Sequence, residues 1–132
     1  MAKQAKILVV DDDPVFVKAT KTVLESKDYQ VSTASDGDEG LRKAKDEKPD
    51  LIILDIIMPT KDGFQACEEL KRDPKLSKIP VIMLTSFAER RGETSIPVSR
   101  GFGLEAEDYI DTPVKPEELL RRVEKQLKKR GS

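Results

Sequence analysis

A chain of 132 residues is long enough for one layered hydrophobic core and too short for two, so we expect a single domain over residues 1–132. The 24 basic and 25 acidic side chains nearly cancel, so charge gives no reason to expect direct binding to nucleic acid or a membrane. There is no histidine and one cysteine, Cys67, which excludes an internal disulfide and argues against zinc sites and histidine-dependent hydrolases. No apolar run approaches the roughly 20 residues of a membrane span, and the N-terminus lacks a signal peptide, so we expect a cytoplasmic protein.

The N-terminal part of the chain predicts a strand, a helix and a second strand. Residues 7–10 are a continuous run of branched apolar residues, which is typical of a strand buried on both faces of a parallel sheet. Asp13 and Pro14 then supply an N-cap and a first helical position. Apolar residues follow at helical spacing, namely Val15, Phe16, Ala19, Val23 and Leu24. Residues 29–34 alternate in polarity, which predicts an edge strand.

The middle of the chain continues the alternation. Residues 51–54 and 80–84 are two further apolar runs that predict buried strands. Apolar residues at helical spacing predict a helix on each side of the first of these runs: Leu41 and Ala44 before it, and Phe64, Cys67 and Leu70 after it. Such an alternation of strands and helices predicts a doubly wound α/β fold with a parallel sheet.

The stretch between Thr85 and Tyr109 breaks this pattern. It contains Gly92, Pro97, Gly101 and Gly103, and a proline inside a helix loses a hydrogen bond and clashes with the preceding turn. We therefore expect an irregular or displaced fourth helix. Tyr109 and Ile110 mark a fifth strand. Apolar residues at helical spacing predict a last helix: Leu119, Leu120, Val123 and Leu127.

Acidic and hydroxyl side chains follow the predicted buried strands. Asp11 and Asp12 follow the first strand, Asp55 ends the third, and Thr85 and Ser86 follow the fourth. Ligands of open α/β sheets bind at the carboxyl ends of the strands, so these side chains are expected to converge. Crowded carboxylates need a cation or a proton between them, and oxygen ligands without histidine favour Mg²⁺.

Each of these residues also has a purely structural interpretation. Asp13 is expected only to cap the helix that begins at Pro14, and Asp11 and Asp12 could share that role. Asp55 could be a turn residue that closes a strand, although an acidic residue next to four buried apolar ones is costly unless its charge is used. Thr85 could be an ordinary strand-end hydroxyl.

From about residue 6 to residue 127 the sequence resembles the receiver domain of bacterial response regulators. Residues 7–12 look like the first strand of that family with its metal-binding acidic pair. Residues 55–63, with Met-Pro and a closing Asp-Gly, are similar to the phosphoacceptor segment. Thr85 matches the hydroxyl residue, and Tyr109 falls at the position of the aromatic switch residue.

The resemblance implies a flavodoxin-like sheet of order 2-1-3-4-5 and a signalling role rather than that of a conventional enzyme. Asp55 would accept a phosphoryl group from a histidine kinase, a phosphotransfer protein or a small phosphodonor. Mg²⁺ would be held by Asp12, Asp55, the main-chain carbonyl of Ile57 and, through water, Asp11. Thr85 would bind the phosphoryl group, and the output would be a downstream protein partner or a homodimer.

The sequence departs from the family pattern at the lysine expected three residues after the aromatic residue. That register gives Thr112, followed by Pro113, and Lys115 could replace the lysine only in another register. A degenerate receiver that binds partners without phosphorylation is therefore the alternative function. A magnesium-dependent phosphatase on a similar fold would need a second aspartate two residues after the nucleophile, where the chain has Ile57.

Overall fold

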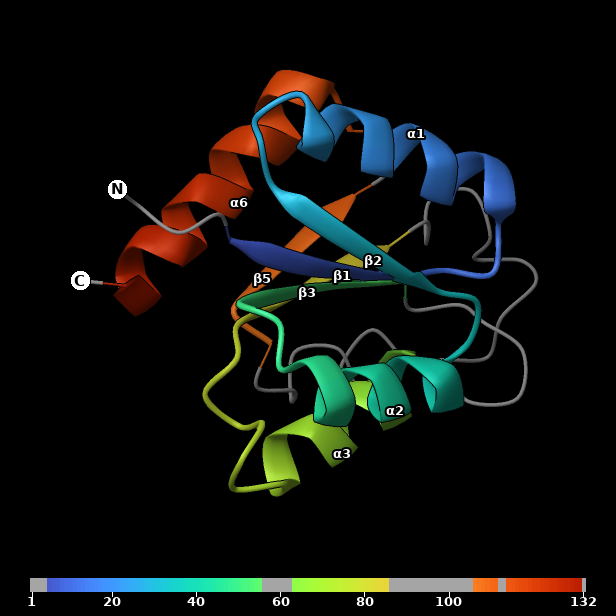
Figure 1. Cartoon of the computed structure of the whole chain (residues 1–132), viewed down its shortest axis with the longest axis vertical. Helices are drawn as coiled ribbons and strands as arrows, with labels where there is room; N and C mark the ends of the chain where they lie inside the picture. The colour runs from blue at the N-terminus through green and yellow to red at the C-terminus, as the bar shows by residue number, and fades with distance from the viewer. Residues whose placement is uncertain (1–4, 56–62, 86–105, 112–113, 132) are drawn as a thin grey trace.

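The fold is a five-stranded parallel sheet with the strand order β2-β1-β3-β4-β5. The computed structural model of the protein describes residues 5–55, 63–85, 106–111 and 114–131 (Figure 1). The strands are β1 (Lys6–Val10), β2 (Gln30–Ala34), β3 (Leu51–Asp55), β4 (Val81–Thr85) and β5 (Asp108–Asp111). The predicted doubly wound sheet and its order are confirmed, and every pair of neighbouring strands is parallel.

Helices cover both faces of the sheet. The described helices are α1 (Pro14–Glu25), α2 (Gly37–Glu47), α3 (Gly63–Arg72) and α6 (Pro116–Gly131). Figure 1 shows α1 and α6 on one face of the sheet and α2 and α3 on the other. None of these helices combines the length and the hydrophobicity needed to cross a membrane. The expectation of an irregular fourth helix concerns residues that lie outside the described ranges.

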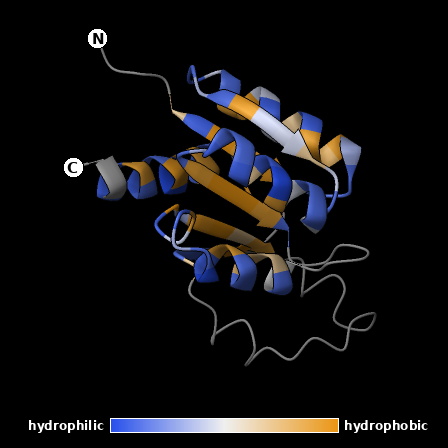
Figure 2. Cartoon of the chain, turned by 60° about the horizontal axis from the view of Figure 1, so that its bottom comes forward, coloured by the Kyte–Doolittle hydropathy of each residue, from blue (hydrophilic) through white to orange (hydrophobic). Residues whose placement is uncertain are grey.

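One apolar cluster lies on each face of the sheet, because successive side chains of a strand point in opposite directions. Along β1, Leu8 and Val10 join the cluster under α2 and α3, whereas Ile7 and Val9 join the cluster under α1 and α6. The central strands β3 and β4 are therefore orange over most of their length in Figure 2. This burial on both faces is the physical reason for the continuous hydrophobic runs in the sequence.

The helix α1 buries a different stripe from the one that the sequence favours. Asp13 caps the helix as predicted, but Val15 is 77% exposed and Ala19 is also exposed. Thr20 and Leu24 are buried instead. Nine positions at 3.6 residues per turn place Val15 about 180° from Leu24 around the helix, so both cannot face the core.

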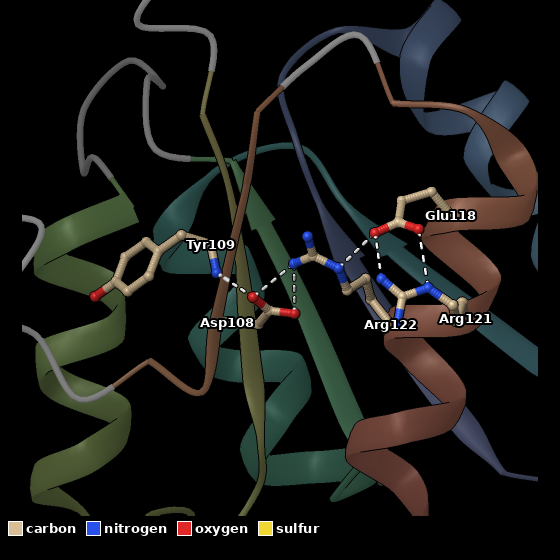
Figure 3. Close-up of polar contacts among 5 residues, drawn as sticks. All are labelled: Asp108, Tyr109, Glu118, Arg121 and Arg122. Carbon is tan, nitrogen blue, oxygen red and sulfur yellow. Dashed lines mark hydrogen bonds and ion pairs between the residues drawn. The ribbon is translucent and has the colours of Figure 1, made fainter.

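The edge strand β5 is tied to α6 by charged groups. One guanidinium nitrogen of Arg122, Nη1, donates to both carboxylate oxygens of Asp108 at 2.8 and 2.9 Å (Figure 3). Hydrogen bonds from Arg121 and Arg122 lower the pKa of Glu118 to about 2. One Asp108 oxygen also accepts the N–H of Tyr109 at 2.8 Å.

The helix α2 approaches β1 very closely at Gly40. A Cβ atom placed on this glycine would lie 2.9 and 3.0 Å from the two methyl carbons of Val10. Val10 is 1% exposed and its β-branched side chain is restricted in χ1, so it has little room to move aside. Gly40 therefore sets the distance between this helix and the sheet.

We expect Gly40→Ala to destabilise the protein by about 1–2 kcal/mol, because overpacking costs about 1–3 kcal/mol and the gain in helix propensity recovers up to about 1. Urea unfolding measures the change. Asp46→Ala, at an exposed position of the same helix, is the control for propensity alone. Equal or greater stability of Gly40→Ala would show that α2 can move away from β1 without cost.

Candidate functional site

The strand register places two carboxylates side by side at the carboxyl edge of the sheet. Val10 of β1 pairs with Leu54 of β3, so the next residues along the two strands, Asp11 and Asp55, are neighbours. The backbone N–H of Asp11 donates to the carbonyl of Ala34 at 3.0 Å, which extends the ladder with β2 by one step. Ligands of open α/β sheets bind at this edge.

Asp11, Asp12 and Asp55 form a compact acidic cluster. One carboxylate oxygen of each lies within 4.8 Å of the other two, and no other such group of three metal-ligating residues occurs in the described part of the chain. Asp11 is 7% exposed and Asp55 is 9% exposed, while Asp12 is open to solvent. Asp13 does not join them, because its side chain accepts the N–H groups of Val15 and Phe16 as the cap of α1.

Burial raises the pKa of Asp11 to about 6, and repulsion from Asp12 and Asp13 adds to this rise. Two hydrogen bonds act in the opposite direction, one from the backbone N–H of Asp13 at 2.9 Å and one shared with Asp55. Several negative charges are therefore crowded into a partly dry pocket at neutral pH. This is the condition under which a bound cation stabilises carboxylates.

The oxygen donors fit a small divalent cation. Two oxygens that each bind Mg²⁺ at about 2.1 Å are separated by about 3–4 Å, so modest side-chain rotations bring the three carboxylates into range. The site has no nitrogen or sulfur ligand among the described residues of the cluster. Hard cations with oxygen coordination are therefore favoured over transition metals.

The remaining predicted site residues are placed only in part. Thr85 ends β4, one step beyond Leu84, which pairs with Asp55, so its backbone reaches the same edge of the sheet. Tyr109 lies in β5. Lys115 is exposed, and its carbonyl accepts the N–H of Leu119 at the start of α6.

The other three predicted residues, Ile57, Ser86 and Thr112, lie outside the described ranges. The sequence-based choice between Thr112 and Lys115 as the position of the family lysine thus remains a prediction.

A hollow of about 290 Å³ beside the acidic cluster was not predicted from the sequence. Asp11, Asp12 and residues of β2 and α2 line it, including Thr33 and Lys43. The amine of Lys43 donates to the main-chain carbonyl of Thr33 and lies 3.6 Å from a carboxylate oxygen of Glu39. The four-residue spacing of Glu39 and Lys43 on a helix could have indicated their pairing, but not their position beside the cluster.

The profile of the response regulator receiver domain matches residues 7–124. The alkaline phosphatase synthesis transcriptional regulatory protein PhoP of Bacillus subtilis is 40% identical over 124 residues, which are 94% of this chain and 49% of PhoP. Protein PilH of Pseudomonas aeruginosa is 39% identical over 119 residues, 90% of this chain and 94% of PilH. The chain spans about half the length of several curated relatives that it matches.

A solved structure extends the similarity to the fold. The receiver domain of the Pseudomonas aeruginosa sensor histidine kinase PA1611, with a magnesium ion coordinated in its active site cleft, superposes with a TM-score of 0.83. The two chains are 28% identical, and the match covers 98% of this chain and all of the other. The sheet order, the acidic cluster and these similarities lead to one conclusion: the chain belongs to the response regulator receiver domain family of two-component signalling systems.

Proposed function

We propose that this domain is a phosphoacceptor switch in which a carboxylate oxygen of Asp55 attacks the phosphorus of a phosphohistidine on a partner protein. The P–N bond breaks, the aspartyl phosphate forms, and the released imidazole nitrogen takes up a proton. The observation that carries the proposal is the position of Asp55, which is 9% exposed at the carboxyl edge of β3 and adjoins Asp11 and Asp12. Burial of an ionisable carboxylate is costly, so a buried carboxylate at the ligand-binding edge of the sheet supports a reactive or metal-binding role.

We assign the same residues to a Mg²⁺ site. Asp12, Asp55 and the main-chain carbonyl of Ile57 would be ligands, and Asp11 would bind through water. The convergence of three carboxylates within 4.8 Å supports the assignment, as does the magnesium ion in the PA1611 receiver. The ion would supply positive charge to the transferring phosphoryl oxygens.

Thr85 and Tyr109 would link the phosphoryl group to the surface of the domain. The hydroxyl of Thr85 would donate to a phosphoryl oxygen, and Tyr109 would change its packing in response. The position of Thr85 at the end of β4, next to β3, supports the first role. The half-buried ring of Tyr109, which packs against the cluster under α2 and α3, supports the second.

The partners in this proposal are proteins. A histidine kinase or phosphotransfer protein would donate the phosphoryl group, and a downstream protein or a second copy of the domain would receive the signal. The balanced charge supports the absence of direct nucleic-acid binding by this domain, although PhoP, which is about twice as long as the matching segment, is named a transcriptional regulator. A reducing, cytoplasmic location is part of the same proposal, supported by the single cysteine, Cys67, which is buried and cannot form an internal disulfide.

Incubation with acetyl phosphate and Mg²⁺ should add the mass of one phosphoryl group, and intact mass measurement detects it. Asp55→Asn should abolish the addition and weaken Mg²⁺ affinity at least about tenfold, since even supporting groups around a metal are worth 10–100-fold. Asp13→Asn is the matched control, because asparagine also caps a helix. Phosphoryl uptake by Asp55→Asn would place the acceptor elsewhere, and no uptake by the parent would favour a degenerate receiver.

The raised pKa of Asp11 predicts how metal-free stability depends on pH. The folded protein binds the Asp11 proton more tightly than the unfolded chain, so this contribution is full below the unfolded pKa near 4 and is lost as pH rises through about 6. Urea unfolding of the parent and of Asp11→Asn in metal-free buffer measures it. The parent should lose stability relative to Asp11→Asn between pH 4 and 7, and Mg²⁺ should reverse the loss. A constant difference across this range contradicts the burial of an ionising Asp11.

Substitution of Lys115 and Thr112 tests the position of the family lysine. Lys115→Ala should leave phosphoryl uptake unchanged, because Lys115 is exposed at the start of α6. Thr112→Lys should raise the midpoint of metal-free unfolding, because an ammonium group near the cluster offsets its charge. Loss of uptake in Lys115→Ala, with no stabilisation in Thr112→Lys, would identify Lys115 as the functional lysine instead.

A further inference from the structure

Lys71, in the last turn of α3, places a buried ammonium group at the end of the sheet opposite the acidic cluster. Its side chain is 7% exposed. The amine donates to both carboxylate oxygens of Glu107 at 2.9 and 3.0 Å, and to the carbonyls of Ile79 and Ser77 at 3.0 and 3.2 Å. One side chain thus joins α3, the loop before β4 and the residue before β5.

Glu107 in turn fixes where β5 begins. Its backbone N–H donates to the carbonyl of Val81 at 2.9 Å, and its carboxylate accepts the N–H of the same residue at 2.7 Å. The next step of the ladder is the first pair of the β4–β5 register, Ile82 with Asp108. The Lys71–Glu107 ion pair therefore holds the strand start in a fixed position relative to α3.

Tyr109, the second residue of β5, lies two positions after Glu107 in the chain. The ring of Tyr109 and the guanidinium of Arg122 lie on opposite sides of the strand in Figure 3. Tyr109 packs against the cluster that contains Cys67, which lies one turn before Lys71 on α3. Burial raises the pKa of Tyr109, and the nearby Cys67 and Glu107 raise it further, which is consistent with a ring held between them.

We infer that Lys71 and Glu107 are positioning residues for Tyr109. The helix α3 follows Asp55 in the chain after residues 56–62, and the ion pair makes the start of β5 move with the far end of that helix. The ion pair thus sets the position of the Tyr109 ring relative to α3, and a change in the position of that helix on phosphorylation would reach the ring through it. The inference rests on the proposed function, because it assigns a route from the phosphorylated site to the predicted switch residue.

The burial of Lys71 and its four contacts distinguish this ion pair from the exposed pairs within single helices. Exposed pairs such as Arg121–Glu118 or Lys128–Glu124 join residues of one helix and cannot transmit a displacement between elements. Lys71–Glu107 joins residues 36 positions apart. Removal of Glu107 would leave the buried ammonium group of Lys71 without its counter-ion, which is costly.

Fluorescence of Tyr109 provides the test. The chain has two tyrosines and no tryptophan, so Tyr29→Phe leaves Tyr109 as the only source of tyrosine fluorescence. Acrylamide quenching is measured before and after addition of beryllofluoride with Mg²⁺, an analogue of the phosphoryl group. The variants are Lys71→Met, the conservative Lys71→Arg, and Lys75→Met as an exposed lysine control.

Beryllofluoride should change the quenching of Tyr109 in the parent, in Lys71→Arg and in Lys75→Met. In Lys71→Met the change should shrink at least about fivefold, the lower range of coupling between sites, while phosphoryl uptake from acetyl phosphate persists. An undiminished response in Lys71→Met, or no response in a parent that is phosphorylated, overturns the inference. If Lys71→Met does not fold, the double variant Lys71→Met/Glu107→Gln removes both charges and takes its place.

Amide exchange separates this inference from the proposed function. If no variant takes up phosphate, the proposed function fails, and the positioning role is judged without ligand. Lys71→Met should then speed exchange at the amides of Tyr109 and Ile110 at least about tenfold, with β2 unchanged, because only the start of β5 is released. Equal exchange in parent and variant rejects the positioning role.

Discussion

The burial of two neighbouring strands that end in aspartate is the constraint on which the rest of this domain depends. β1 and β3 lie in the interior of the sheet and are covered on both faces, so the packing of their apolar side chains fixes their register relative to each other. That register brings Asp11 and Asp55 together at the carboxyl edge of the sheet. Burial of the apolar side chains therefore offsets the repulsion between the carboxylates of Asp11 and Asp55. The packing of β1 and β3 in the core determines the geometry of the acidic cluster.

The ionic contacts of the domain divide into two kinds with different consequences. Exposed pairs within one helix, such as Lys21–Glu25, contribute about 0.3–0.5 kcal/mol each and add little to the choice of fold. Pairs between elements act on β5 from both faces of the sheet. Glu107 is joined to α3 and Asp108 to α6. β5 is a short edge strand that pairs only with β4. The ion pairs of Glu107 and Asp108 therefore help to fix its position, in addition to its backbone hydrogen bonds.

Much of the fold and part of the site could be predicted from the sequence because the relevant signals are local. Continuous apolar runs before Asp11 and Asp55 identify buried strands, and strand ends identify the edge at which ligands bind. In α1 the sequence offers two apolar stripes, and local pattern cannot decide between them. Thr20 is buried, although a hydroxyl residue gives no hydrophobic signal, and Val15 is exposed.

The long-range contacts could not be predicted in the same way. The pairing of Lys71 with Glu107 depends on where two segments meet after the sheet has formed, and nothing in either segment identifies the other. The close contact of Gly40 with Val10 is similar, because a glycine in a helix usually signals only weak propensity.

The contact between Lys43 and Thr33 has a consequence for the open side of the sheet. β2 is an edge strand, and the carbonyl of Ala34 faces β1, so the carbonyl of Thr33 faces outward under the strand alternation. An outward carbonyl on an edge is a template for the backbone of another chain. The charged amine of Lys43, a residue of α2, donates a hydrogen bond to the carbonyl of Thr33 and so occupies this site. A foreign strand would have to displace and desolvate that ammonium before it could extend the sheet, so the edge is guarded against aggregation by a residue of the neighbouring helix.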